Sequence, residues 1–160
     1  GDALAVACLN KKKFNKYDFS RLHPSGNLGT KLKTVEDLML TGPKIPFINE
    51  NLKMKDALKI ITKKKLGVLI AQNSRGNTTG ILTDGTVRRA SLKNKNLQSL
   101  TVKKIMTKNP ISVEQDILAA KALALMNSKK ITSLIINRKK NKNKTIGILH
   151  IHNILEANVQ

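Results

Sequence analysis

Apolar residues follow two patterns that recur along the chain in the same order. Each copy begins with apolar positions spaced as on one face of an α-helix: Met54, Ala57, Leu58 and Ile61, and later Ala119, Ala122, Leu123 and Met126. A continuous apolar run follows, residues 66–71 or 131–136, and such runs are typical of buried strands. A polar turn, a second apolar segment at 81–82 or 148–149 and a closing helix complete each copy.

The amino acids themselves also repeat. The phrase Thr-Val-x-x-Leu/Ile-Met begins at Thr34 and Thr101, and Gly-Ile-Leu begins at Gly80 and Gly147, so both phrases recur after 67 residues. One period shared by two landmarks indicates two copies of one structural unit. With a short strand after the Pro-containing turn, each unit is β-α-β-β-α, which is α/β in class. We expect the units to pack about a pseudo-two-fold axis with small-molecule clefts between them.

The patterns divide the chain into four parts. Residues 1–33 read as a helix and a loop, 34–92 as the first unit, 93–100 as a polar linker and 101–160 as the second unit. The chain begins without Met, in what reads as the middle of a helix, so we expect a piece of a longer protein.

The formal net charge of +20 raises the question of a polyanionic partner. The cations are 25 Lys against 5 Arg, scattered over every element, and aromatic residues make up only 2% of the chain. Base readout and phosphate forks favour Arg, and base stacking needs aromatic side chains. We therefore interpret the charge mainly as compositional drift, and expect neither a specific nucleic-acid partner nor a membrane.

Cys8 is the only cysteine, so an intrachain disulfide is excluded and a reduced, cytoplasmic compartment fits. The apolar run from Ala3 to Leu9 is too short to span a bilayer and suits a packed helix. Carboxylates are sparse near the histidines, so we expect no metal site, and no cofactor is indicated.

The order of these units, with Gly80-Ile81-Leu82-Thr83-Asp84-Gly85-Thr86 closing the first one, resembles the CBS domain, which occurs in tandem pairs. The preceding residues, with His23-Pro24-Ser25-Gly26 and then Asn27-Leu28-Gly29, resemble the end of a sugar isomerase domain. Together the motifs are similar to the D-arabinose 5-phosphate isomerases, which supply arabinose 5-phosphate for the sugar Kdo of lipopolysaccharide or capsule.

This resemblance implies that most of a catalytic isomerase domain would precede residue 1. It also implies a role in acid–base catalysis for His23, only in the intact parent, because a near-neutral pKa suits proton transfer between carbons. The alternative is a solvent-exposed loop histidine. We expect this 160-residue chain alone to be inactive as an isomerase.

In the CBS family a hydroxyl, followed three positions later by a carboxylate or amide, holds a nucleotide. Thr83 and Thr86 occupy these positions in the first unit, and His150 and Asn153 in the second. Neither copy has the complete pair, so we expect weak binding of plain adenine nucleotides.

Further polar residues are expected at the same strand ends. Arg88 and Arg89 at a helix start suit a phosphate or carboxylate, although surface ion pairs with Asp84 or Glu156 are the alternative. A regular strand would direct His150 and His152 to one face. The candidate ligand residues are thus Thr83, Asp84, Thr86, Arg88, Arg89, His150, His152 and Asn153.

The sequence is compatible with three functions. The first is a regulatory module that senses a nucleotide or sugar nucleotide, attached to the missing isomerase domain in a homo-oligomer. The second is a ligand-free module that only holds isomerase subunits together. The third, less favoured, is a basic nucleic-acid-binding domain.

Overall fold

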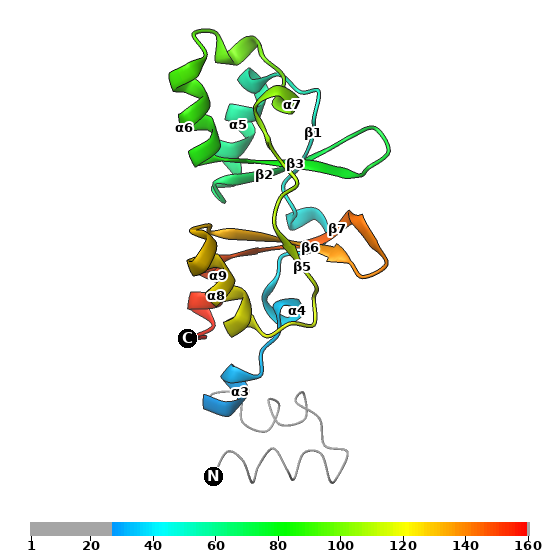
Figure 1. Ribbon diagram of the computed structural model, residues 1–160, viewed down its shortest axis with the longest axis vertical. Coiled ribbons are helices and arrows are strands. Elements are labelled where there is room, and N and C mark those ends of the chain that lie inside the picture. Colours follow the sequence, from blue (N-terminus) through cyan, green and yellow to red (C-terminus); the bar gives the residue numbers. More distant parts are fainter. Residues whose placement is uncertain (1–26, 160) are drawn as a thin grey trace.

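The computed structural model describes residues 27–159, and two short sheets organise them (Figure 1). The first unit consists of β1 (Phe47–Asn49), α5 (Met54–Lys64), β2 (Val68–Gln72), β3 (Thr78–Thr83) and α6 (Asp84–Lys93). The second unit consists of β5 (Ser112–Val113), α8 (Ala119–Lys129), β6 (Ser133–Arg138), β7 (Asn141–His150) and α9 (Ile151–Glu156). The predicted β-α-β-β-α order is therefore confirmed in both copies.

The remaining elements are short and connect these units. They are α3 (Asn27–Lys31), α4 (Val35–Leu38), η1 (Gly42–Lys44), η2 (Leu97–Ser99), α7 (Val102–Ile105) and β4 (Thr107–Lys108). Among the described residues, none of the helices is long and apolar enough to cross a membrane.

Both sheets have the same topology. β1 pairs parallel with β2 and β2 antiparallel with β3, as β5 pairs with β6 and β6 with β7. The antiparallel pairing sets Val68 opposite Thr83 and Ser133 opposite His150. The loop before β2 or β6 therefore lies beside the start of α6 or α9, which is where the candidate site forms.

The first helix of each unit follows from the spacing of its apolar residues. α5 buries Met54, Ala57 and Ile61, and α8 buries Ala119, Ala122 and Met126, as the sequence pattern predicts. Both helices end at a lysine in the left-handed conformation, Lys65 with φ 59° and Lys130 with φ 56°. This turn directs the chain from the helix into the next strand.

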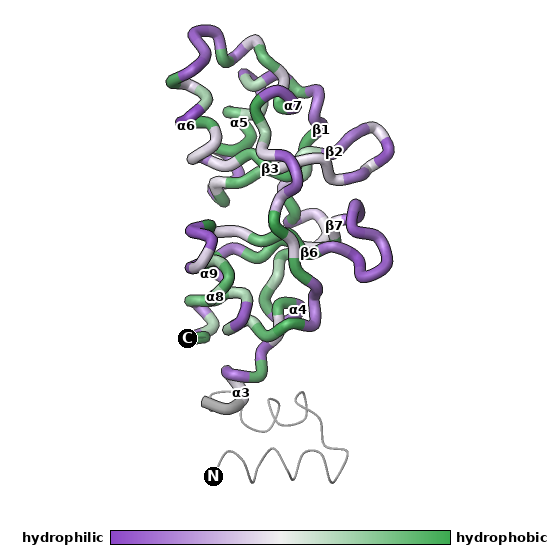
Figure 2. The backbone as a smooth tube through the Cα atoms, viewed as in Figure 1, coloured by the Kyte–Doolittle hydropathy of each residue, from purple (hydrophilic) through white to green (hydrophobic). Residues whose placement is uncertain are grey.

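The units stack with their sheets facing each other. Between the sheets lies a cluster of Ile45, Val68, Ile70, Ile81, Ile135 and Ile148, all buried. The helices cover the outer sides of the two sheets, and the hairpins β2–β3 and β6–β7 project side by side (Figure 1). Apolar segments run through the strands, whereas the hairpin tips are hydrophilic (Figure 2). Burial of the facing surfaces explains why the two copies pack as a pair.

The short helices α4 and α7 each pack on the opposite unit. α4 precedes the first unit's strands but packs on the second unit, and α7 precedes the second unit's strands but packs on the first. Val35 belongs to the core of the second unit, where its N–H donates to the carbonyl of Ile117 (2.9 Å). Val102 belongs to the core of the first unit, where its N–H donates to the carbonyl of Leu52 (2.8 Å). The two units therefore exchange equivalent segments.

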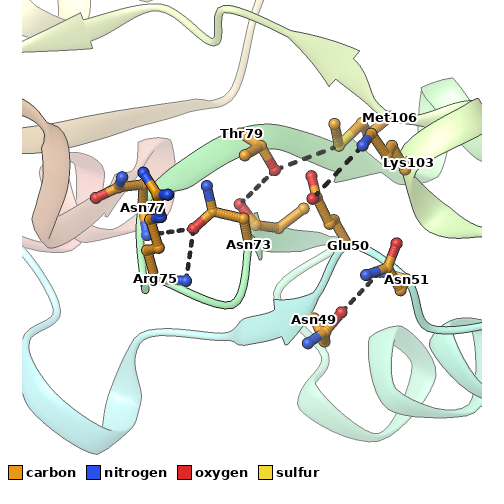
Figure 3. A network of polar contacts seen from close by, with 10 residues as sticks. Asn49, Glu50, Asn51, Asn73, Arg75, Asn77, Thr79, Lys103 and Met106 are labelled. Atoms are coloured by element: carbon orange, nitrogen blue, oxygen red, sulfur yellow. Dashed lines mark hydrogen bonds and ion pairs between the residues drawn. The ribbon is translucent and has the colours of Figure 1, made fainter.

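A polar contact fastens α7 to the first unit (Figure 3). The buried Glu50 accepts from the backbone N–H of Lys103 at its carbonyl (2.8 Å), and its carboxylate lies 3.8 Å from Lys103 Nζ. Beside it, Thr79 Oγ1 donates to the carbonyl of Ala71 at 3.3 Å and lies 3.9 Å from Met106 Sδ. The exchange is thus stabilised by backbone hydrogen bonds, apolar burial and an ion pair.

Candidate functional site

A cleft of about 460 Å³ lies between the two units. From the first unit it is lined by Leu66, Gly67, Ile81, Thr83, Asp84, Gly85, Thr86 and Arg89. The connection after α7 and the second unit contribute Thr107, Asn109, Pro110, Ile111, Lys130, Ile131, Thr132, Ser133 and His150. Because both units line the cleft, a molecule bound there would contact both.

Three hydroxyls converge on one side of the cleft, and we call Thr83, Thr86 and Thr107 the threonine triad. Thr86 Oγ1 lies 2.9 Å from Thr83 Oγ1 and 3.4 Å from Thr107 Oγ1. Thr83 precedes α6 and accepts from the backbone N–H of Thr86 (3.1 Å), as an N-cap residue does. β4 supplies Thr107 because it pairs with β3, opposite Ile81.

Asp84 is held against a glycine. Its backbone N–H donates to the carbonyl of Gly67 (3.1 Å), and a Cβ added to Gly67 would lie 2.8 Å from Asp84 Oδ2. Gly67 also has a φ of +70°, a conformation that residues with a side chain rarely adopt. A glycine is therefore required at the point where the loop passes the Asp84 carboxylate.

Two cations line the cleft. Lys130 comes from the end of α8, and Arg89 from the second turn of α6. A Cβ added to Gly85 would lie 3.2 Å from Arg89 Nη1 and 3.8 Å from Thr83 Oγ1, so the guanidinium and the Thr83 hydroxyl both lie close to Gly85. Arg88 is exposed and is not among the lining residues.

The expectation that one strand carries both His150 and His152 is wrong. β7 ends at His150, and His152 is an exposed residue of α9 outside the cleft lining. The helix starts here because His150 Nδ1 accepts from the N–H of His152 (3.1 Å) and Asn153 Oδ1 accepts from the N–H of His150 (2.9 Å), a capping box. The two rings nevertheless stack, with centroids 4.8 Å apart.

The surroundings of His150 favour its neutral form. Desolvation by burial, and secondly the neighbouring His152, lower the pKa of His150 from its ordinary value. Neutral Nδ1 is also what the helix cap requires, because a protonated Nδ1 cannot accept the N–H of His152.

Equivalent positions of the second unit have different chemistry. Counterparts 67 residues apart are Thr83 and His150, Thr86 and Asn153, and Arg89 and Glu156. Thr107 likewise corresponds to Leu40, which packs in the apolar cluster between the sheets. At the second unit a carboxylate thus stands in place of the cation, and Leu40 of the first unit, which pairs with Ile148, stands in place of the hydroxyl.

Of the eight predicted ligand residues, the structure brings five to the cleft: Thr83, Asp84, Thr86, Arg89 and His150. Arg88, His152 and Asn153 are not part of its lining. His23 and Cys8 lie outside the described residues, as do residues 1–26 in general.

Sequence reasoning missed Gly67, Lys130, Thr132, Ser133 and the segment 107–111. A signal for the first four was present. The two long strands of each unit pair antiparallel, so the loop before the first of them lies beside the end of the second, where the predicted ligand residues are. The segment 107–111 had no such signal, since its place depends on the exchange of α7. Within the described residues there is also no group of three or more His, Cys, Asp or Glu that would hold a metal ion.

The chain is similar in sequence to one protein family and to a group of curated proteins. The CBS domain family matches residues 35–93 and 102–159. Arabinose 5-phosphate isomerase KdsD of Salmonella typhimurium is 40% identical over 160 residues, which cover 99% of this chain and 48% of that protein. The chain therefore spans about half the length of the curated relatives that it matches.

Two solved structures show the same fold. CBSX2, in complex with AMP, superposes with a TM-score of 0.69 at 23% identity, covering 79% of this chain and 96% of that one. The CBS domain pair of MJ0100, in complex with 5′-methylthioadenosine and S-adenosyl-L-methionine, has a TM-score of 0.68 at 22% identity, covering 78% and 94%. At these identities the likeness establishes the architecture.

Proposed function

The chain belongs to the CBS domain family, of which it carries two copies, and from this we propose that it is the ligand-sensing regulatory module of a D-arabinose 5-phosphate isomerase. The intact protein would interconvert D-ribulose 5-phosphate and D-arabinose 5-phosphate for Kdo synthesis. The identity to KdsD along nearly the whole chain supports the parent enzyme.

The observation that carries the sensing role is the cleft between the units. Its 460 Å³ is within the range of small-molecule sites, and its lining combines apolar side chains with a few convergent polar groups. CBSX2 and MJ0100, which have this fold, are described with adenine-containing ligands. These observations support a nucleotide or sugar nucleotide as the ligand of the proposed cleft.

The connectivity suggests how binding would reach the rest of the protein. The chain entering from residue 33 is fixed to the second unit, because the Lys33 carbonyl accepts from the N–H of Ala119 (2.8 Å) and Val35 is fully buried there. A ligand that contacts both units would favour one relative placement of them, and α4 would transmit that placement to the preceding segment. Such a ligand shifts an equilibrium only as far as its affinities for the two placements differ.

A titration with a matched pair of variants tests the sensing role. AMP, ATP and a sugar nucleotide are titrated into the chain by calorimetry and by thermal shift. Arg89→Ala should weaken binding at least tenfold, while Arg88→Ala, the neighbouring arginine outside the cleft, should leave it unchanged. Absence of a saturable response to every compound, or equal loss in both variants, would overturn the proposal.

A second function, holding isomerase subunits together without a ligand, is favoured by exposed leucines on the helices. Leu92 of α6 is 84% exposed and Leu155 of α9 is 51% exposed. Light scattering after size exclusion decides between the two: a dimer that Leu92→Glu or Leu155→Glu dissociates, together with no ligand response, would favour assembly.

A further inference from the structure

We propose that the tips of the hairpins β2–β3 and β6–β7 form an electrostatic docking surface for an anionic lipid bilayer. Four cations at these tips make up the surface, which we call the basic tip: Arg75, Lys140, Lys142 and Lys144. The cleft is separate from it, because Gly67 and Thr83 lie at the other ends of the same strands. A bilayer against the basic tip would therefore leave the cleft open.

The first hairpin ends in a turn with a defined shape (Figure 3). Asn73 Oδ1 accepts from the backbone N–H groups of Arg75 and Asn77, both at 3.0 Å. Gly76 supplies the left-handed conformation that closes the turn, with a φ of +75°. Arg75 is exposed. The turn thus fixes the backbone from which the guanidinium extends.

The second hairpin is longer and carries most of the charge. Its strand pairing shifts between Asn137 and Arg138, so that residues 142–144 lie between two consecutive pairs, as in a bulge. Lys140 in the turn and Lys142 in this bulge are both exposed. The end of the second hairpin therefore presents its lysines to the surroundings.

Two contacts join the hairpins into one surface. Lys144 Nζ donates to the carbonyl of Arg75 at 3.0 Å, and nearer the sheets Thr78 Oγ1 lies 2.6 Å from Thr145 Oγ1. A Cβ added to Gly76 would lie only 3.4 Å from Lys144 Nζ. The charges of two units, far apart in sequence, thus act together at one end of the molecule.

Carboxylates do not neutralise the basic tip. Neither hairpin loop contains Asp or Glu, and within residues 27–159 none of the four cations forms an ion pair. At the base of the second hairpin, Arg138 and Lys139 share a hollow with Glu114 and Asp116, and Lys139 Nζ lies 3.7 Å from Asp116 Oδ2. These two cations are therefore left out of the basic tip.

Among polyanions, a lipid surface fits the tips better than a nucleic acid. Clusters of about four to eight Lys or Arg are attracted to anionic headgroups. A major groove about 12 Å wide admits one two-stranded ribbon, whereas here two ribbons end together and meet a flat surface at once. The hydrophilic loops, residues 73–77 and 139–144, have no aromatic side chain for base stacking (Figure 2). The scatter of lysines along the sequence concealed this gathering.

Vesicle sedimentation of the 160-residue chain tests the proposal. The probes are vesicles of phosphatidylcholine alone and of phosphatidylcholine with an equal share of phosphatidylglycerol. The chain should bind only the anionic vesicles, and about 1 M salt should release it, because charge interactions are then screened beyond about 3 Å. Lys140→Gln with Lys142→Gln should lower the partition coefficient about 25-fold, or about fivefold per lysine.

A second double variant controls for net charge. Lys63→Gln with Lys64→Gln removes the same two charges from the exposed last turn of α5, at the end of β2 away from the hairpin, and should leave partitioning nearly unchanged. Arg75→Gln should lower partitioning about fivefold, since the first hairpin also contacts the bilayer. Circular dichroism checks that each variant is folded.

Several outcomes would overturn the proposal. Equal losses in the two double variants would show that binding follows net charge alone. Equal binding to neutral vesicles, or no binding to anionic ones, would exclude an anionic lipid surface as the partner. Binding of a short DNA duplex that the hairpin variants abolish, without vesicle binding, would assign the basic tip to nucleic acid. None of these results changes the cleft, so ligand sensing is tested separately.

Discussion

Thr78 Oγ1 and Thr145 Oγ1 lie 2.6 Å apart, and the two residues are separated by 67 positions, the period of the repeat. A residue that contacts its own counterpart must lie on or next to the axis that relates the two copies. The contact therefore places the pseudo-two-fold axis between the hairpins β2–β3 and β6–β7. The same relation holds for Ile81 and Ile148, which lie together in the cluster between the sheets.

Replacing these threonines should have unequal effects despite the symmetry. Thr145 Oγ1 also donates to Asn137 Oδ1 (3.1 Å), so Thr78 is the donor in the contact between them. Thr145→Val therefore loses two hydrogen bonds and should lower the free energy of unfolding by about 2 kcal/mol, against about 1 kcal/mol for Thr78→Val. Urea unfolding measures both, with Thr41→Val, at an exposed threonine whose side chain makes no cap hydrogen bond, as a control near zero. Equal losses in all three variants would contradict the axial contact.

Two equivalent glycines should also respond differently to alanine. A Cβ at Gly80 would lie 2.6 Å from Met106 Sδ and 2.8 Å from the Thr107 carbonyl, whereas at Gly147 it would lie 2.5 Å from Met39 Sδ and 3.2 Å from the Leu40 carbonyl. A methionine side chain can move aside, but the Thr107 backbone is held by its strand pairing. Gly80→Ala should cost about 3 kcal/mol and Gly147→Ala about 1 kcal/mol in urea unfolding. A larger loss of stability for Gly147→Ala than for Gly80→Ala would contradict this prediction, because it would show that the close Thr107 carbonyl does not decide the cost.

The sequence predicted the units well because each unit is specified locally. The apolar spacing of Met54, Ala57 and Ile61 describes the buried face of α5, and the run 66–71 includes every residue of β2 except Gln72. The single period was only partly right. Counterparts such as Gly80 and Gly147 are 67 apart, but Met54 and Ala119, at the starts of α5 and α8, are 65 apart. The second unit has a longer hairpin and a shorter approach to its first strand.

The arrangement of the units was less predictable, because it depends on contacts distant in sequence. Val35 and Val102 have similar local sequences, and nothing near them indicates that each packs on the other unit. For the same reason Thr107 was not recognised as a neighbour of Thr86, although the two lie in the cleft together. His152 was misplaced for a local reason: a side-chain cap at His150 ends the strand there, two residues before His152.

The free energy of unfolding should fall below neutral pH in a way that depends on His150. Burial, and secondly His152, lower the pKa of His150 below the value of about 6.5 that it has when unfolded. As the pH falls through 6.5, the unfolded chain takes up a proton that the folded chain refuses, so stability is lost until the pH passes the folded pKa. Above about pH 7.5 the contribution is complete.

His150→Asn isolates this effect, since asparagine also caps helices but does not titrate near neutral pH. Thermal unfolding between pH 5 and 8 should show a smaller loss of stability on acidification in His150→Asn than in the unmodified chain. His152→Asn should retain a pH dependence from His150, reduced because the secondary cause of the shift is gone. An unchanged pH dependence in His150→Asn would contradict the assignment.

Isomerase activity should require the intact protein. Isomerisation of a sugar phosphate needs a base, an acid and a phosphate-holding pocket placed together. The resemblance supplies only His23 of that set, so the 160-residue chain should not interconvert ribulose 5-phosphate and arabinose 5-phosphate.

In the intact parent, His23→Ala should lower turnover about 10²–10⁴-fold, the usual contribution of a general acid or base. Arg89→Ala in the parent should instead leave basal turnover unchanged and abolish any response to a ligand of the cleft. Activity of the chain alone, or full activity of the His23→Ala parent, would refute the division into a catalytic part before this chain and a regulatory part within it.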